Sequence, residues 1–150
     1  VRVANPVPQG QIISLNECFY PTPQRAALNA ISANAGENVV LRFAVAHGSL
    51  ELARIIQRQM QNELRVNGEV TPVTTRIGPW RGEGDEYSGG LGIAFFWLIE
   101  APPAGDLRIV LDQRSLDGRP IRTGIDGPDE DSDPEIIPAQ RRLYCAVRVS

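Results

Sequence analysis

Lysine is absent from this 150-residue chain, and histidine and cysteine are scarce, with one and two residues. One histidine and two cysteines cannot supply a conventional structural zinc site. No apolar run is long enough to cross a membrane as a helix, and none resembles a signal peptide. The net charge of −3 argues against a general attraction to nucleic acid or anionic lipid. The sequence therefore predicts no nucleic-acid partner and no membrane insertion.

All 15 basic residues are consequently arginines. A GC-rich coding sequence is the simpler explanation, and the alternative is arginine selected for bidentate contacts at interfaces. The two cysteines, Cys18 and Cys145, lie near opposite ends of the chain. They could form a disulfide in an oxidising compartment, or remain two buried thiols in a particle assembled in the cytosol. An even number of cysteines does not decide between these alternatives.

Glycine and proline, by contrast, are frequent, with 14 and 12 residues, which implies many turns and few long helices. The length fits a single domain that buries a sizeable core. Residues 1–10 contain two prolines and a glycine, a composition typical of an extended segment. We therefore expect an N-terminal arm at 1–10 and one domain at 11–150.

The most apolar part of the chain consists of residues 91–99 and 107–111, separated by Pro-Pro-Ala-Gly at 102–105. Aromatic and β-branched runs bounded by glycine and proline are typical of buried strands. Proline has no N–H to donate to a sheet, so residues 102–105 are expected to form a turn. We interpret the two runs as a hairpin at the centre of a β-rich core.

Further strands are predicted on both sides of this hairpin. Residues 37–47 and 142–149 alternate between apolar and other side chains, as half-buried strands do. Residues 49–63 have apolar positions at helical spacing and are predicted to form one amphipathic helix. Asn67-Gly68 is the strongest short signal for a hairpin, and residues 26–32 fit either a helix or a strand. The predicted fold is mainly β, a two-sheet antiparallel β-sandwich with one short helix, and its core is expected to include Leu41, Phe43, Val45, Phe95, Trp97 and Ile99.

The order of features in residues 64–111 is distinctive: a strand, Asn-Gly, a glycine-rich loop, an aromatic strand ending in Phe-Trp-Leu, and Pro-Pro-Ala-Gly. It resembles jelly-roll-like β-sandwich modules of phage virion accessory proteins (decoration, spike or fibre proteins) and of bacterial surface proteins. With residues 37–46, the resemblance covers about half of the chain, and its motif is structural. It implies attachment, decoration or ligand binding, and it transfers no catalytic residues.

The glycine-rich loop at 78–90 carries the best binding candidates, Trp80, Arg81 and Tyr87. Exposed aromatic rings stack on sugars or anchor interfaces, and an arginine binds carboxylate or phosphate. The alternative is a loop that folds its own aromatic rings back onto the sandwich.

An acidic run at 126–135 contains Asp129, Asp131 and Asp133, which have the spacing of the first ligands in a calcium loop. The pattern then fails, because Pro134 replaces the required glycine and Gln140 the final glutamate. We expect a solvated loop and no cofactor, with an irregular calcium site as the weaker alternative.

Catalytic candidates lack a supporting pattern. His47 lies two residues before Ser49, but no serine has the G-x-S-x-G sequence of a nucleophile elbow. No signal selects a pair of carboxylates for glycoside hydrolysis among Asp85, Glu86, Asp112 and Asp117. We therefore expect a chain that is not an enzyme.

Two functions remain. The first is a structural module of a phage or phage-like virion, contacting copies of itself and a capsid or other virion protein. The second is a carbohydrate-binding or adhesin module of a secreted or cell-surface bacterial protein, which binds a surface glycan through Trp80 and Tyr87.

Overall fold

The computed structural model describes residues 8–47, 50–79, 91–122 and 136–150. Strands predominate in these ranges, and the helices are short. The strands are β1 (Gln11–Ser14), β2 (Ile31–Ala33), β3 (Val39–His47), β4 (Met60–Val66), β5 (Glu69–Thr71), β6 (Val73–Pro79), β7 (Leu91–Ile99), β8 (Gly105–Ser115), β9 (Ile121–Arg122), β10 (Ile136–Ile137) and β11 (Gln140–Val149). The helices are η1 (Leu15–Glu17, a 3-10 turn), α1 (Pro23–Leu28) and α2 (Leu50–Gln59).

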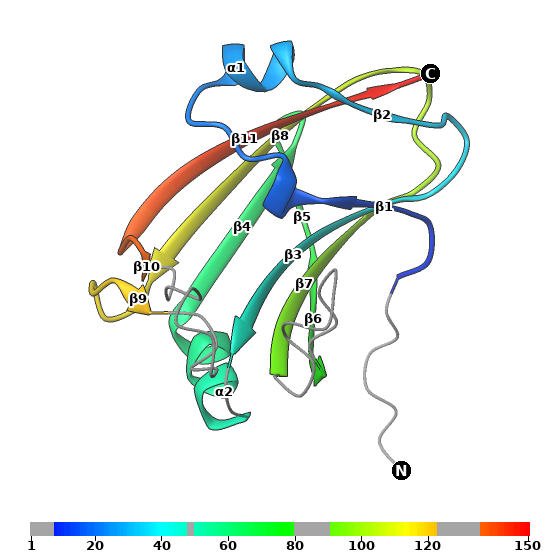
Figure 1. Ribbon diagram of the computed structural model, residues 1–150. Coiled ribbons are helices and arrows are strands. Elements are labelled where there is room, and N and C mark those ends of the chain that lie inside the picture. Colours follow the sequence, from blue (N-terminus) through cyan, green and yellow to red (C-terminus); the bar gives the residue numbers. More distant parts are fainter. Residues whose placement is uncertain (1–7, 48–49, 80–90, 123–135) are drawn as a thin grey trace.

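Two sheets form the body of the molecule (Figure 1). Sheet A has the strand order β1-β3-β7-β6, and sheet B has the order β2-β11-β8-β4-β5. The prediction of a mainly β, two-sheet sandwich is therefore confirmed. The sheets are mixed rather than purely antiparallel, because β1 runs parallel to β3 and β2 runs parallel to β11. The N-terminal part of the chain crosses from one sheet to the other through η1 and α1, and adds one short strand to each.

The strand order is that of an immunoglobulin-type sandwich rather than of a jelly roll. In immunoglobulin terms, β3, β7 and β6 take the places of strands B, E and D, and β1 lies in the place of strand A but runs parallel to β3 rather than antiparallel. Strands β11, β8, β4 and β5 take those of G, F, C and C′, and β2 is an additional edge strand. Three connections therefore leave from one end of the sandwich: α2 between β3 and β4, residues 80–90 between β6 and β7, and the segment from β8 to β11. The register shows this directly, because His47 and Pro79 both pair with Leu91.

The predicted central hairpin is wrong. Strand β7 pairs with β3 and β6 in sheet A, whereas β8 pairs with β11 and β4 in sheet B. The proline-containing segment carries the chain from one sheet to the other, a distance of roughly 10 Å. Ala101 and Gly105 have φ values of 30° and 146°, and the Ala101 N–H donates to Asn38 Oδ1 at 3.0 Å. The residues indicated two buried strands correctly but carried no information about which strands they pair with.

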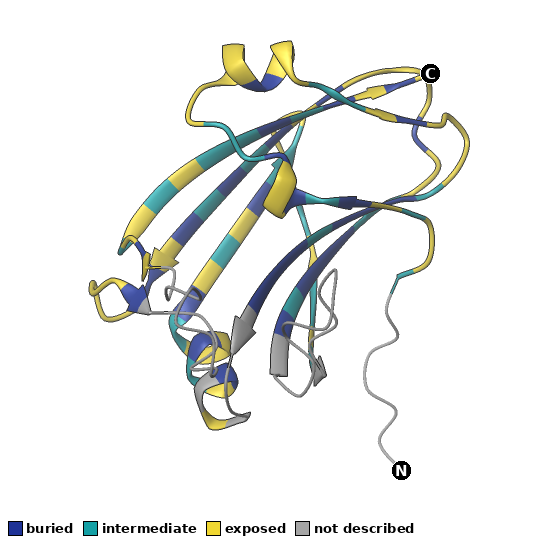
Figure 2. Cartoon of the chain, viewed as in Figure 1, coloured by how far each residue is buried: buried dark blue, intermediate teal, exposed yellow. Residues whose placement is uncertain are grey.

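The core lies between the inner faces of the two sheets (Figure 2). The alternation of apolar residues in the sequence predicted the core correctly, because five of the six predicted core residues are buried and Ile99 is partly buried. Both faces of β3 are covered, since Val40 and Ala44 on the opposite face are buried as well. Among the described residues, Trp97 is the largest side chain that is fully buried.

The helix predicted over residues 49–63 is shorter than expected, because α2 ends at Gln59 and β4 begins at Met60. Met60 and Leu64 misled the prediction, since residues four apart share a face in a helix and also in a strand. The Asn67-Gly68 hairpin between β4 and β5 is confirmed, with φ values of 51° and 88°. A second helix, α1, occupies the first part of the ambiguous segment, and β2 follows it.

Cys18 and Cys145 form a disulfide with a Cα–Cα distance of 5.3 Å, which settles the alternative that the sequence left open. Both residues are buried in the core. Beside them, Tyr20 and Tyr144 exchange backbone hydrogen bonds in an isolated bridge. The disulfide and the bridge together fasten the N-terminal segment to β11.

Candidate functional site

The binding residues predicted from sequence, Trp80, Arg81 and Tyr87, lie outside the described residues. The weak calcium candidates Asp129, Asp131 and Asp133 do so too, as do Ser49, Asp85, Glu86 and the side chain of His47. The structure does describe the strand ends that flank residues 80–90. Residues 80–90 begin and end at the Pro79–Leu91 pair, beside the end of β3.

A face rich in arginine is the main candidate site among the described residues. It is the outer face of sheet B, where alternate residues of β4, β8 and β11 point away from the core. We call it the arginine face, and it comprises Arg65, Arg108, Arg114, Arg142 and Arg148 together with Glu63, Asp106 and Asp112.

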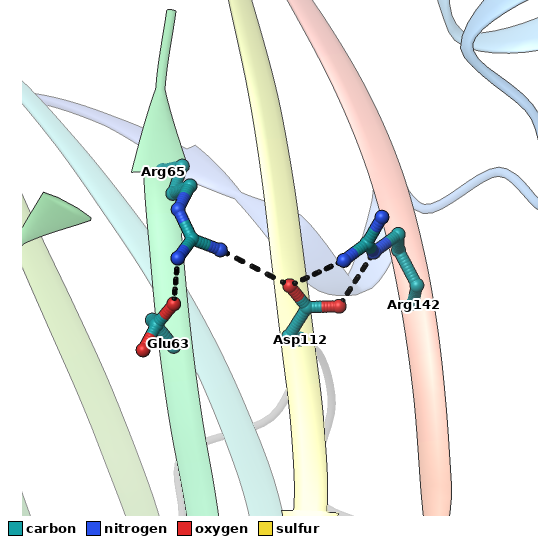
Figure 3. Close-up of polar contacts among 4 residues, drawn as sticks. All are labelled: Glu63, Arg65, Asp112 and Arg142. Atoms are coloured by element: carbon teal, nitrogen blue, oxygen red, sulfur yellow. Dashed lines mark hydrogen bonds and ion pairs between the residues drawn. The ribbon is translucent and has the colours of Figure 1, made fainter. Parts of the chain in front are cut away.

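Asp112 occupies the centre of the arginine face between two arginines (Figure 3). Arg142 holds it with two hydrogen bonds, from Nε to Oδ1 at 2.7 Å and from the guanidinium to Oδ2 at 3.2 Å. Arg65 approaches the same carboxylate at 3.5 Å and also pairs with Glu63. The hydrogen bonds to Asp112 raise the pKa of Arg142 above its ordinary value. Asp112 therefore orients Arg65 and Arg142 on this face.

Asp117, another carboxylate considered for catalysis, lies outside the arginine face. It lies in the turn after β8, where it accepts hydrogen bonds from the Ser115 hydroxyl and from the Arg119 N–H. These bonds, that from Ser115 first, lower the pKa of Asp117. Asp112 and Asp117 thus have separate partners, and the described structure shows no contact that joins them in one site.

The lower part of the arginine face is hollowed, with a volume of about 550 Å³. Its walls are amides and charged groups from three adjacent strands, and Arg114 donates to Gln61 Oε1 at 2.9 Å across it. The lining side chains on the outer face are Gln61, Glu63, Asp112, Arg114, Gln140 and Arg142. Such a wall can hydrogen-bond hydroxyl, carboxylate or peptide groups.

Two arginines of this face are free to take outside partners. The Arg108 guanidinium has no hydrogen bond or ion pair with another described residue, and Arg148 makes only an exposed pair with Asp106 at 3.5 Å. Sequence reasoning missed the arginine face because it treated the arginines only as composition. Polar and charged residues alternate with inward-facing ones in residues 61–65, 108–114 and 140–148. This alternation could have predicted the arginine face if the three segments had been known to be neighbouring strands.

Within the described ranges, no group of three or more His, Cys, Asp or Glu residues could hold a metal ion. No helix of these ranges is long and apolar enough to span a membrane. The chain matches no protein-family model, no curated protein and no solved structure. Its class is therefore defined by the fold: a disulfide-linked β-sandwich with an immunoglobulin-type strand order.

Proposed function

We propose that this chain is a non-enzymatic structural module of a phage or phage-like virion, a capsid decoration or spike/fibre component, that works through protein–protein contacts. The observation that carries the proposal is the arginine face. Arginine is enriched at protein interfaces because its planar guanidinium binds carboxylates and peptide groups with two hydrogen bonds. Support for the virion setting comes from the sequence resemblance alone.

Charge favours contacts between copies of the chain. Five arginines and three carboxylates give the arginine face a net charge of +2. The remaining residues, with 10 arginines and 15 carboxylates, carry −5. Nine of those carboxylates and one of those arginines belong to residues 80–90 and 123–135, so the arginine face of one copy is complementary in charge to these acidic segments of the next. A contact between two different surfaces propagates into rings or arrays, in which many weak contacts give strong attachment.

Self-association measured by mass photometry and sedimentation tests this proposal. The wild-type chain should form oligomers at micromolar concentration that weaken at high salt, because the contact is electrostatic. The double variant Arg108→Glu/Arg148→Glu should weaken association by at least about tenfold, or about 1.4 kcal/mol. The double variant Arg25→Glu/Arg76→Glu is the matched control, because both are exposed arginines outside the arginine face and the change in net charge is the same. A wild-type chain that stays monomeric and binds no shell protein would contradict the proposal.

A carbohydrate-binding or adhesin module of a secreted or surface protein is the second candidate. The hollow on the arginine face favours it, because amides and carboxylates are the groups that hydrogen-bond sugar hydroxyls. Trp80 and Tyr87 are the residues that the sequence predicts to stack on sugar rings. Glycan-array binding that is lost in Trp80→Ala or Gln140→Ala would favour this candidate, and an array without any signal would remove it.

A further inference from the structure

A second hollow, of about 520 Å³, lies at the edge of the sandwich where the chain passes from β5 to β6. We call it the interlayer hollow. Its apolar surface includes Met60 and Phe95, which are buried at 4% and 3% exposure. Its lining residues are Gln57, Met60, Gln61, Asn62, Glu63, Val70, Thr71, Pro72, Val73, Thr75 and Phe95. The lining is mixed, with five apolar and six polar or charged residues, and the volume lies within the range of small-molecule sites.

A chain of three side chains fixes the orientation of the Asn62 amide. Arg141 can only donate, so Gln113 must present Oε1 to the Arg141 Nε. The Nε2 of Gln113 is then left to donate to Asn62 Oδ1 at 2.8 Å. Because Asn62 Oδ1 is occupied by this bond, Nδ2 is the group of the Asn62 side chain that is left to form another hydrogen bond. The orientation of both amides follows from the arginine and is not an arbitrary choice between oxygen and nitrogen.

The Nδ2 group of Asn62 is buried and has no hydrogen-bond partner. A buried donor without an acceptor is unfavourable, and such a group in a native structure calls for an explanation. Asn62 lines the interlayer hollow, on the same inward-facing side as Thr71 and Thr75. The missing acceptor can therefore be supplied from the hollow. The indole Nε1 of Trp97 is also unpaired, but Trp97 does not line the hollow and plays no part in this argument.

We infer that the interlayer hollow binds a small, neutral, largely apolar molecule whose carbonyl oxygen accepts a hydrogen bond from Asn62 Nδ2. The apolar body of the ligand packs mainly on the exposed side chains of Val70 and Val73, with Met60 and Phe95 beneath them. A neutral ligand is favoured because Glu63, the charged residue among those that line the hollow, is already paired with Arg65. The terminal torsion of asparagine is broad, so a small rotation presents Nδ2 to the ligand while Oδ1 keeps its bond to Gln113. The inference does not rest on the proposed structural function, because its donor Asn62 faces the inner side of β4, although Gln61 and Glu63 line both this hollow and the one on the arginine face.

Two probes of nearly equal shape test the inference: acetophenone, which has a carbonyl oxygen, and α-methylstyrene, which has a methylene group there. Met60 is the single methionine of the chain, so its methyl resonance reports unambiguously on the hollow. Both probes should shift this resonance, and acetophenone should bind about tenfold more tightly because one hydrogen bond is gained. Acetophenone alone should also shift the side-chain amide resonances of Asn62.

Variants separate this site from nonspecific binding. Asn62→Leu should bind both probes with equal affinity, because the donor is gone. Val73→Arg should abolish binding by filling the hollow, whereas Thr74→Arg places the same charge on the opposite face of β6 and should bind normally. Val73 is 44% exposed, so its variant should fold even if Asn62→Leu does not. Equal affinities in the wild type, a preference that survives Asn62→Leu, or an unmoved Met60 resonance would each overturn the inference.

Discussion

The Cys18–Cys145 disulfide should supply a large part of the stability of the oxidised chain. Its two residues are 127 apart in sequence, so the bond closes almost the whole domain into one loop. In the chain-entropy treatment, closing a loop of this length in the unfolded state is worth about 4.9 kcal/mol at room temperature. Measured disulfides commonly contribute about 2–4 kcal/mol. We therefore expect reduction to lower the free energy of unfolding by about 3–5 kcal/mol, and the Tm by roughly 10–20 °C.

Urea unfolding of the oxidised and the reduced protein, followed by circular dichroism, measures this difference. The denaturation midpoint should fall on reduction. The m-value should rise, because an unlinked unfolded chain exposes more surface than a looped one. The Cys18→Ala/Cys145→Ala variant should resemble the reduced wild type and should not respond to the reductant.

The reasoning fails if the oxidised and reduced proteins have the same midpoint and m-value. It also fails if the alanine variant responds to the reductant as the wild type does. Hydrogen exchange adds a local readout, because the segment around η1 and Tyr20 should lose protection first when its link to β11 is removed.

Two further predictions concern turns. Gly68→Ala should cost about 1 kcal/mol in urea unfolding, because φ is +88° and nothing near an added Cβ would clash, so the whole cost is conformational; an unchanged midpoint would contradict it. The pKa of Asp117 is lowered in the folded state, so its stabilising contribution is complete above its ordinary pKa and is lost as the pH falls through the lowered value. Wild type should therefore lose more stability than Asp117→Asn on acidification below about pH 4, measured as the urea midpoint at acidic and neutral pH; equal acid sensitivity would refute this.

Local patterns predicted the elements better than their partners. The alternation in β3 and β11 and the Asn67-Gly68 turn were sufficient, because each depends on residues close in sequence. The pairing of β7 and β8 was not predictable in this way. A proline-rich joint is compatible with a hairpin and equally with a crossing between sheets, and the choice depends on long-range contacts with β3 and β11.

The arginine face shows the same limit. Arg65, Asp112 and Arg142 are far apart in sequence, and only the register of β4, β8 and β11 brings them into one row. The lack of lysine was explained more simply by coding composition than by arginine contacts at interfaces, and no local signal could assign the arginines to one face. The inward-facing row of Asn62, Gln113 and Arg141 was equally hard to predict, because its polar side chains occupy positions where alternation predicts apolar ones.

The two edges of the sandwich differ in how the sheets are joined, and this difference favours binding at one of them. At the edge formed by β1 and β2, the N-terminal segment crosses between the sheets and the disulfide holds it to β11. At the opposite edge, β5 has only three residues, and Pro72 alone joins it to β6. Because proline offers no N–H and β5 is short, this edge gives few groups to close the gap between the sheets. The interlayer hollow lies at this edge, and so does Asn62 Nδ2, a buried donor without a hydrogen-bond partner. The edge where the sheets are less firmly joined is therefore also the edge where a ligand can supply an acceptor.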